Sequence, residues 1–260
     1  MIPLADTHVH LLAGLDDGPK TLDVALSMCR MLSSQGVRHA TALCHQNDGY
    51  PNNLPGLMST MAQELRQALH DRGIPLAVYS TGEVMLTPSL DQHFAAGRYQ
   101  TVGGHGKWLL VEMPHGMFVD LLPVAFALRG RGVRLIVAHA ERYPELLHDP
   151  ALAERWIAAG CLIQVTSQAY ADPWNTADEK SLKLWAERGF VHMLGSDGHG
   201  IERRPPRIIE GYRRLVKWAG ASAAERIGSH WGIAALQGLP INAPPPQKPR
   251  KSWFTRLLGD

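Results

Sequence analysis

Short apolar runs alternate with segments of helical periodicity along most of the chain. Between residues 22 and 32, apolar side chains recur every three or four positions, which predicts a helix that Gly36 ends. Residues 108–111 are continuously apolar, as is typical of a strand buried on both faces. The strands predicted in this way are residues 2–7, 37–43, 74–80, 108–112, 133–139, 161–165 and 190–194. Helices are predicted at residues 22–35, 57–69 and 119–129, in segments up to 159, at 177–188, and over most of the remainder to 236.

Seven units of strand followed by helix predict an α/β fold. Such alternation requires parallel strands joined by right-handed crossovers, and seven units suit a barrel about as well as an open sheet. In a parallel barrel the functional groups gather at the carboxyl ends of the strands. The residues at those ends are therefore the first candidates for a site.

Six of the seven predicted strands end in His, Glu or Asp. In the first strand, His8 and His10 are two positions apart and so point to the same face. Surface histidines and stray carboxylates would not be expected to fall on strand ends so regularly. The candidate ligands at these ends are His8, His10, His45, Glu83, Glu112, His139, Asp197 and His199.

This set of imidazoles and carboxylates exceeds the needs of one tetrahedral metal ion. It predicts two or three divalent cations, with a carboxylate such as Glu83 bridging two of them. Ligation without thiolate favours manganese, iron or zinc. Such cations lower the pKa of bound water from about 15.7 to near 7 and neutralise phosphoryl oxygens, which predicts phosphoester hydrolysis.

Two arginines near the candidate ligands are suited to holding a phosphate. Arg142 follows His139 by three residues, and Arg204 follows His199 by five. A guanidinium can form two parallel hydrogen bonds to phosphate oxygens. On spacing alone, a surface salt bridge explains either arginine equally well.

Composition describes an ordinary globular chain and excludes several classes of protein. Of 260 residues, 45% are hydrophobic and 19% charged, and the net charge is +2. The three cysteines lack CxxC spacing and fit a reducing compartment; Cys44 and Cys161 also lack the Arg six positions on that a thiol phosphatase needs. Near-neutral charge, without a basic patch interleaved with aromatics, argues against nucleic acid. No signal peptide or transmembrane segment is recognised, so a cytoplasmic protein is expected.

The composition changes at Pro240. Residues 240–260 are rich in proline and basic residues, and we expect them to form an extended, flexible tail detached from a barrel domain of residues 1–239. The basic and apolar residues near the end could contact an anionic membrane or a partner. A solvated, disordered end is the alternative.

Several motifs taken together resemble a known superfamily. They are His8-x-His10, Asp17-Gly18-Pro19, His45, Gly82-Glu83, Glu112, Ala138-His139-x-Glu141-Arg142-Tyr143 and Ser196-Asp197-x-His199. They resemble the polymerase-and-histidinol-phosphatase (PHP) superfamily and, within it, the manganese-dependent protein-tyrosine phosphatases of bacterial capsule and exopolysaccharide synthesis. The resemblance extends from about residue 4 to 236. It implies a distorted (β/α)7 TIM-like barrel with a trinuclear metal centre, loaded with manganese or else with iron or zinc.

The resemblance also implies a role for each residue. One ion would bind His8, His10, Glu83 and Asp197; a second would bind Glu83, Glu112 and His139; a third would bind Asp17, His45 and His199. Arg142 and Arg204 coincide with the family's phosphate-contacting arginines. Asp16 is an alternative to Asp17, which is favoured because it directly precedes the glycine.

The predicted activity is hydrolysis of phosphotyrosine in proteins, with a tyrosine kinase of capsule or exopolysaccharide synthesis as substrate. A metal-bridging hydroxide would attack phosphorus without a phospho-enzyme, and His199 or a metal-bound water would protonate the leaving group. Docking of the tail would place the enzyme at the inner face of the membrane, and a homo-oligomer is compatible with the sequence.

Three alternatives remain open at this point. One keeps the chemistry and changes the substrate: a small-molecule phosphatase, acting for example on histidinol phosphate, or an exonuclease, against which the near-neutral charge argues. Another is a metal-dependent amidohydrolase, although such barrels usually place a bridging lysine at a mid-barrel strand end and Lys107 lies at the start of a strand. The third is a degenerate barrel that serves as a binding scaffold.

Overall fold

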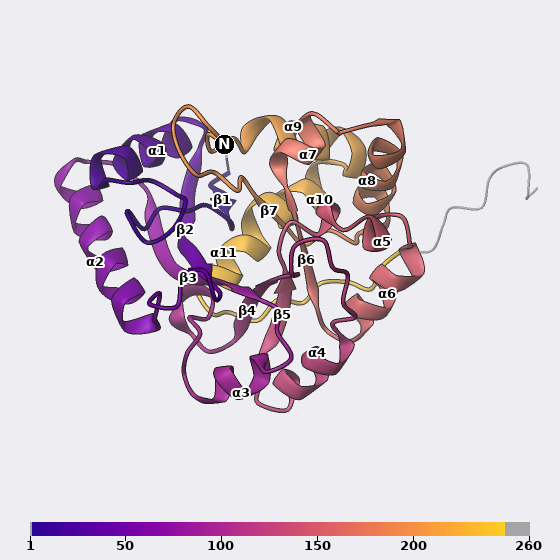
Figure 1. The fold of residues 1–260 in the computed structure, drawn as a ribbon. Coiled ribbons are helices and arrows are strands. Elements are labelled where there is room, and N and C mark those ends of the chain that lie inside the picture. The colour runs from indigo at the N-terminus through magenta and orange to yellow at the C-terminus, as the bar shows by residue number, and fades with distance from the viewer. Residues whose placement is uncertain (1, 248–260) are drawn as a thin grey trace, which may run out of the picture.

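The fold is a parallel β/α barrel in a computed structural model that describes residues 2–247 (Figure 1). Its strands are hydrogen-bonded in sequence order, and each neighbouring pair is parallel. The strands are β1 (Leu4–Asp6), β2 (Val37–Gln46), β3 (Ala77–Met85), β4 (Trp108–Glu112), β5 (Arg134–Val137), β6 (Leu162–Thr166) and β7 (Met193–Gly195). The predicted (β/α)7 barrel is therefore confirmed.

Backbone hydrogen bonds between the first and last strands bring the barrel close to closure. Just beyond β1, the amide of Thr7 donates to the carbonyl of Leu194 on β7 at 3.1 Å. The amide of Asp197 donates to the carbonyl of His8 at 2.7 Å. These bonds lie at the carboxyl ends of β1 and β7, so they also fix the loops that carry the candidate site.

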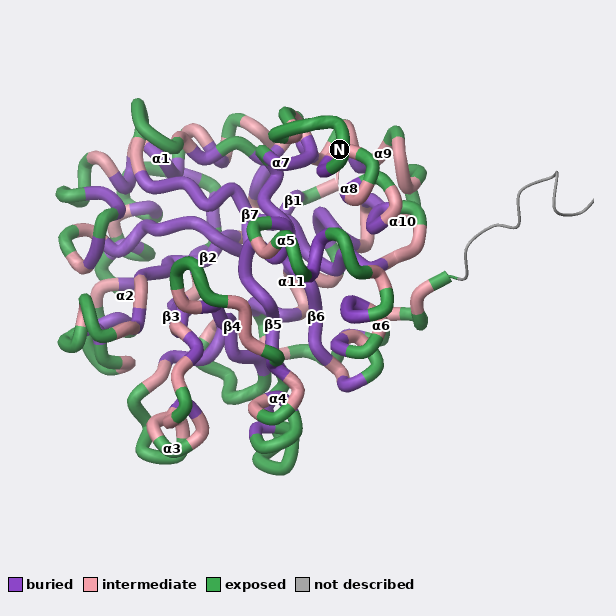
Figure 2. The backbone as a smooth tube through the Cα atoms, turned by 45° about the vertical axis from the view of Figure 1, so that its right-hand side comes forward, coloured by how far each residue is buried: buried purple, intermediate pink, exposed green. Residues whose placement is uncertain are grey.

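Helices surround the strands, and their inner faces are buried while their outer faces are exposed (Figures 1 and 2). The helices that follow β1 to β5 are α1 (Leu22–Ser34), α2 (Pro55–Asp71), α3 (Leu90–Ala95), the 3-10 turn η1 (Val102–Gly104), α4 (Leu122–Arg129), the 3-10 turn η2 (Ala140–Arg142), α5 (Pro144–Leu147) and α6 (Pro150–Ala158). After β6 and β7 come α7 (Ser167–Ala171), α8 (Thr176–Arg188), α9 (Ile209–Ala219), α10 (Ala221–Glu225), the π-helical turn η3 (Arg226–His230) and α11 (Trp231–Leu236).

Local sequence explains where the helices begin and end. Asn175 caps α8 by accepting from the amides of Ala177 and Asp178, and Gly189 ends the helix at a φ of 74°. Asp149 caps α6 in the same way, ahead of Pro150 at the first helical position.

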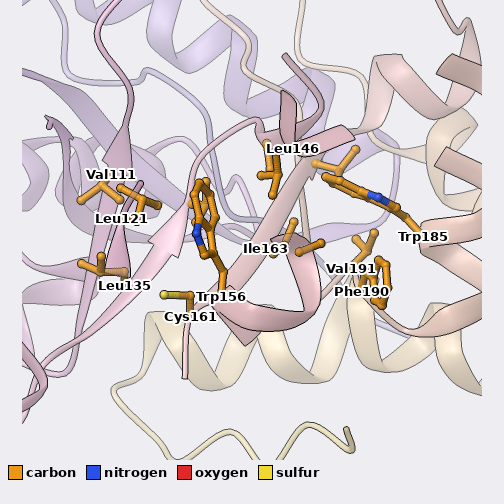
Figure 3. Close-up of a cluster of buried hydrophobic side chains, with 14 of the residues drawn as sticks. Val111, Leu121, Leu135, Leu146, Trp156, Cys161, Ile163, Trp185, Phe190 and Val191 are labelled. Carbon is orange, nitrogen blue, oxygen red and sulfur yellow. The ribbon is translucent and has the colours of Figure 1, made fainter. Parts of the chain in front are cut away.

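Apolar clusters fill the molecule on both sides of the strands. Outside the barrel, Trp156 of α6 packs with Leu135, Ile163 and their neighbours in a large cluster (Figure 3). Inside, Leu110, Ile136 and Met193 meet α11, which covers the amino-terminal end of the barrel. Apolar side chains therefore occupy the amino-terminal end of the barrel interior, and polar side chains lie at its carboxyl-terminal end.

Two strands extend further than predicted. The third strand was expected at residues 74–80 but runs from Ala77 to Met85, and the second continues to Gln46. Polar residues did not end these strands because Gln46 and Glu83 are buried and find polar partners inside the fold. Gly82 makes room for this arrangement, since a Cβ there would lie 2.0 Å from the Gln46 side-chain oxygen.

Residues 196–208 form a loop, although most of the chain after residue 195 was predicted to be helical. Pro205 and Pro206 lack the amide hydrogens that a helix interior needs, and α9 starts only at Ile209. This loop carries Asp197, His199 and Arg204.

The expectation that the chain leaves the core at Pro240 is wrong for residues 241–247. Ile241 is buried in the cluster that contains Leu236. Gln247 exchanges two hydrogen bonds with Arg188 at the end of α8, from its amide at 2.8 Å and to its carbonyl at 2.9 Å. The yellow chain in Figure 1 accordingly runs from α11 toward α6. The basic part of the predicted tail, residues 248–260, lies outside the described residues.

Among residues 2–247, no helix is both long and apolar enough to cross a membrane.

Candidate metal centre

The side chains predicted to bind metal lie together at the carboxyl ends of the strands. His8 and His10 follow β1, and Glu83 and His45 lie near the ends of adjacent β3 and β2. Glu112 ends β4. The remaining members are His139 after β5, Asp197 and His199 after β7, and Asp17 in the loop before α1.

Glu83 lies at the centre of the group and is fully buried. Its Oε1 atom is 3.2 Å from His8 Nε2 and 2.8 Å from His139 Nε2. Its Oε2 atom is 3.3 Å from His10 Nε2 and 3.2 Å from His45 Nδ1. Burial raises the pKa of Glu83, but the surrounding imidazoles outweigh burial and hold it well below its usual range. A carboxylate that reaches four imidazoles with two oxygens is placed to bridge cations.

The other carboxylates extend the group on both sides of Glu83. Glu112 Oε1 lies 3.3 Å from His45 Nδ1, and Asp197 Oδ1 lies 3.5 Å from His8 Nε2. Asp17 Oδ1 lies 3.4 Å from His45 Nε2 and 3.3 Å from His199 Nε2. The sets whose ligand atoms all lie within 4.8 Å of one another are His10, Asp17, His45 and His199; His8, His10 and Asp197; His8, Glu83 and His139; and His45, Glu83 and Glu112.

Asp16 and Asp17 occupy different environments. Asp16 is buried and accepts from His10 Nδ1 at 2.7 Å and from the amides of Gly18 and His45 at 2.9 Å. Despite the opposing effect of burial, these donors lower its pKa to about 2. The side chain of Asp17 is 51% exposed and faces His45 and His199. Asp16 therefore orients a ring from behind, whereas Asp17 faces the open side of the group.

Four imidazoles face the group through Nε2 and have Nδ1 held by another residue: those of His8, His10, His139 and His199. His45 faces the group through both ring nitrogens. His8 Nδ1 lies 2.7 Å from the Gln164 side-chain oxygen, and His139 Nδ1 lies 3.4 Å from the Tyr143 hydroxyl. His199 Nδ1 donates to the carbonyl of Asp197 at 2.9 Å. Metal-binding histidines characteristically use one nitrogen for the metal and the other for such an orienting bond.

Buried atoms without hydrogen-bond partners mark the space between these side chains. Within residues 2–247 they include His8 Nε2, His10 Nε2, His45 Nδ1, Glu83 Oε2, Glu112 Oε1 and His199 Nε2. Burying polar atoms without partners is costly, and divalent cations would satisfy all of them at once. The donor set of nitrogen and oxygen, without thiolate, fits such cations.

The histidines of the group differ in the direction in which their surroundings shift the pKa. Burial lowers the pKa of His10, but hydrogen bonds to Asp16 and Glu83 outweigh it and raise the pKa to about 10. Burial and the neighbouring His10 lower the pKa of His199 to about 4. His199 is therefore neutral at pH 7, with its Nδ1 proton donated to a carbonyl and the Nε2 lone pair facing Asp17.

The three non-glycine residues with positive φ among the described residues all belong to the predicted site. They are His139 at 30°, Asp197 at 53° and Arg204 at 51°. Such conformations are unfavourable for residues with a Cβ and cluster at functional sites.

Arg142 and Arg204 meet at one atom of the group. Both guanidinium groups donate to Oδ2 of Asp197, which lies between them. Together with Arg207, Thr166 and Ser196 they border a cavity of about 300 Å³. The two guanidinium groups beside the metal-binding group are suited to binding a phosphate.

Sequence reasoning missed the orienting residues Gln164 and Asp6. Gln164 is the one polar residue among apolar neighbours at positions 162–165 of β6, which could have marked it as facing the barrel interior. Asp6 accepts from the amides of His8 and Ser196 and so joins the ends of β1 and β7. Tyr143 was noted only as part of a motif.

A nearly closed parallel barrel with clustered His, Asp and Glu side chains at its carboxyl mouth defines a metal-binding enzyme of the β/α-barrel class. The family described as capsular polysaccharide synthesis, CpsB/CapC, matches residues 4–236. The chain belongs to this family.

Similar proteins agree with that assignment. Tyrosine-protein phosphatase YwqE of Bacillus subtilis is 27% identical over 260 residues, covering 96% of this chain and 99% of the relative. Tyrosine-protein phosphatase CpsB of Streptococcus agalactiae serotype III is 24% identical over 230 residues, covering 86% of this chain and 94% of the relative.

Solved structures show the same fold. A chain from a study of YwqE from Bacillus subtilis and CpsB from Streptococcus pneumoniae, described as metal-dependent tyrosine phosphatases, has a TM-score of 0.86 at 24% identity. The match covers 95% of this chain and all of that chain. A β-aspartyl dipeptidase from Fervidobacterium islandicum has a TM-score of 0.55 at 16% identity, covering 90% of this chain and 75% of the other.

Proposed function

We propose that this chain is a metal-dependent phosphatase that hydrolyses phosphotyrosine in proteins. The observation that carries the proposal is the position of Arg142 and Arg204 beside a buried group of imidazoles and carboxylates centred on Glu83. Membership of the CpsB/CapC family and relatives named tyrosine-protein phosphatases support the same activity.

Three divalent cations would bind the group, with manganese favoured over iron and zinc. His8, His10, Glu83 and Asp197 would hold the first; Glu83, Glu112 and His139 the second; Asp17, His45 and His199 the third. The proximity of these side chains and their unpartnered buried atoms support this assignment. Asp17 is favoured as the ligand over Asp16, because Asp16 already accepts three hydrogen bonds.

The residues around the group would position the substrate for in-line attack on phosphorus. Arg142 and Arg204 would hold the phosphoryl oxygens by charge-assisted hydrogen bonds, in place of part of their bonding to Asp197. When bound, the cations supply a hydroxide nucleophile at neutral pH and neutralise charge on the phosphoryl group. Within the described residues the cysteines are buried and outside the group, so no thiol is placed to form a phospho-enzyme.

His199 is better suited to bind a cation than to protonate the leaving group. Its proton is on Nδ1 and is donated to the carbonyl of Asp197, which leaves Nε2 as a lone-pair donor. A tyrosine phenolate has a pKa of about 10 and needs little assistance as a leaving group, so solvent water suffices as the proton source.

An amidohydrolase is the second candidate on fold alone, because the β-aspartyl dipeptidase shares the barrel. Lys107 precedes the first residue of β4 and so lies at the amino end of that strand, opposite the metal group. The carboxyl ends of β3 and β4 carry Glu83 and Glu112 instead. The arginine pair also favours a phosphoryl substrate.

Metal content measured together with turnover of a phosphotyrosine peptide tests the proposal. The wild type should contain divalent metal, release phosphate and lose activity with a chelator, and activity should return when Mn²⁺ is added. Glu83→Ala and His139→Ala should lose metal and activity while keeping the fold. His70→Ala, on the exposed face of α2, is the matched control and should behave as the wild type. Full activity in the presence of a chelator would refute the role of the metal. Faster turnover of histidinol phosphate than of the phosphotyrosine peptide would identify a small molecule as the substrate.

The partner is proposed to be a bacterial tyrosine kinase, and the tail is proposed to contact the inner face of the membrane. Because residues 241–247 pack on the barrel, a chain ending at Gln247 removes the basic segment without disturbing the fold. It should bind anionic vesicles more weakly than the full chain at equal phosphatase activity. Equal vesicle binding by the shortened and the full chain would refute the proposed membrane contact.

A further inference from the structure

A cavity of about 280 Å³ opens directly beside the metal-binding group, and its lining is about equally polar and apolar, with His115 and Glu145 among the polar members. One side is formed by Glu112, His139 and Arg142, and the other sides by the loop after β4 and the start of α5. The apolar lining comes chiefly from Met113, Met117, Phe118, Tyr143 and Pro144. We propose that this cavity holds the phenyl ring of the phosphotyrosyl side chain and selects it over phosphoserine. The proposal rests on the proposed function and adds the residues that decide its specificity.

The walls of the cavity are fixed before any ligand binds. The Tyr143 hydroxyl accepts from the amide of Met113 at 2.9 Å and so joins the two walls. Phe118 stacks on Trp156 with ring centroids 5.8 Å apart and an interplanar angle of 2°. A preformed pocket binds a rigid ring at a low entropic cost.

Met117 is placed to cover a bound ring. The amide of Met117 donates to the carbonyl of Pro114 at 3.1 Å and closes a tight turn, in which Gly116 takes the positive φ of 69°. The turn leaves Met117 60% exposed while its side chain lines the cavity. A methionine side chain adapts to an aromatic face and makes favourable sulfur–ring contacts.

Arg142 connects this cavity to the proposed phosphate-binding site. It borders both the cavity beside Met117 and the cavity that Arg204 and Arg207 line. A phosphate held by Arg142 at the metal group therefore leaves the attached ring beside Met117 and Tyr143. The side chain of phosphoserine has one methylene between phosphate and backbone, so it is too short to fill the apolar space.

The cavity next to Asp17 and His199 presents fewer apolar side chains to a ring than the first cavity does. Four charged side chains (Asp17, Glu202, Arg203 and Arg204) line this cavity and Ile201 is its one large apolar side chain among the described residues, so burying an aromatic face there would desolvate charged groups. Ile201 is 44% exposed and provides a matched control position across the mouth.

Three variants of the metal-loaded protein test the cavity: Met117→Glu, Met117→Leu and Ile201→Glu. They are compared on a phosphotyrosine peptide and on the phosphoserine peptide of the same sequence. Inorganic phosphate, as a product inhibitor, probes the phosphate-binding site alone. Metal content and the unfolding midpoint are measured alongside, and neither should change, because the substituted side chains are exposed.

The expected result is a defect confined to binding of the ring. Met117→Glu should raise KM for the phosphotyrosine peptide about tenfold, with kcat and the inhibition constant of phosphate unchanged. Met117→Leu should stay within about twofold of the wild type, because it keeps the apolar contact. Ile201→Glu adds the same charge at the same mouth and should leave KM unchanged.

Any of three results would overturn the proposal. One is an unchanged KM in Met117→Glu. The others are an equal rise in the phosphate inhibition constant and an equal effect of Ile201→Glu, either of which would mean that the charge acts on the phosphate. Failure of the wild type to turn over any phosphotyrosine peptide would instead refute the proposed function itself.

Discussion

The side-chain oxygen of Gln164 lies 2.7 Å from Nδ1 of His8, across the interior of the barrel. Gln164 comes from β6, the one described strand that supplies no His, Asp or Glu to the metal-binding group. Its amide nitrogen donates to the carbonyl of Thr7 at 3.0 Å and to the hydroxyl of Thr7 at 2.8 Å. Because a carbonyl can only accept, the amide orientation is set, and His8 must carry its proton on Nδ1. Nε2 is then free to bind a cation.

Gln164→Leu should weaken metal binding without removing a ligand. Loss of an orienting partner typically lowers metal affinity about 10- to 100-fold. The measurement is the Mn²⁺ concentration that restores activity and metal content after chelation. Gln67→Leu, exposed on α2, is the control and should match the wild type. Unchanged affinity in Gln164→Leu would show that packing alone orients His8.

Replacing Asp16 and Asp17 separately should give opposite defects. Asp16→Ala leaves His10 Nδ1 and two buried amides without their acceptor, so it should cost about 1–3 kcal/mol of unfolding free energy. Asp17→Ala should keep that stability but lose one of the three proposed ions, because Asp17 is exposed and faces His45 and His199. Urea unfolding of the metal-free protein and elemental analysis separate the two. The reverse pattern would make Asp16 the ligand.

The free energy of unfolding of the metal-free protein should decrease as the pH is lowered, because His192 binds a proton more readily in the unfolded chain than in the folded one. His192 is buried, and its Nδ1 accepts from the amide of Ile163 at 3.1 Å, so burial lowers its pKa from 6.5 to about 4. Between those values the unfolded chain binds the proton and the folded chain does not. The contribution of neutral His192 to the free energy of unfolding is therefore complete above pH 6.5. It is lost as the pH falls toward 4, at about 1.4 kcal/mol per pH unit.

His192→Asn removes this titration and keeps an acceptor near the position of Nδ1. The unfolding free energy of the wild type should therefore fall more steeply than that of His192→Asn between pH 7 and pH 5. Both proteins share every other titrating group, so the difference isolates His192. Parallel curves would contradict the prediction.

Arg142→Lys and Arg204→Lys should each weaken inhibition by inorganic phosphate about tenfold, because lysine keeps the charge but loses the forked donor geometry. Both arginines donate to Asp197 Oδ2, so the double variant should lose less than the product of the two effects. Arg203→Lys changes the exposed neighbour of Arg204 and is the control. An unchanged inhibition constant would place the phosphate elsewhere.

The seven strand–helix units and the identity of the clustered side chains could be predicted, because both follow from local patterns. Apolar runs such as residues 108–112 identify strands, and parallel connection brings His45, Glu83 and Glu112 to one end of the barrel. The position of Glu83 inside β3, rather than beyond it, could not be predicted, because its burial depends on imidazoles from other strands. The packing of Ile241 against the barrel was missed for the same reason: its partners are distant in sequence.

By itself, the sequence determined seven strand–helix units with parallel strands and a set of histidines and acids at the carboxyl ends of those strands, since periodicity and connectivity are properties of the chain alone. The pattern left open whether the strands form a barrel or an open sheet, and the barrel was implied only by the family resemblance. Only the tertiary structure decided which ring nitrogens of the histidines face inward, that Asp16 lies behind His10 while Asp17 faces the open side, and that a cavity with Met117, Phe118 and Tyr143 on its walls adjoins Arg142. These features arise from hydrogen bonds and packing between residues on different strands, such as His8 with Gln164, and sequence spacing carries no record of such distances.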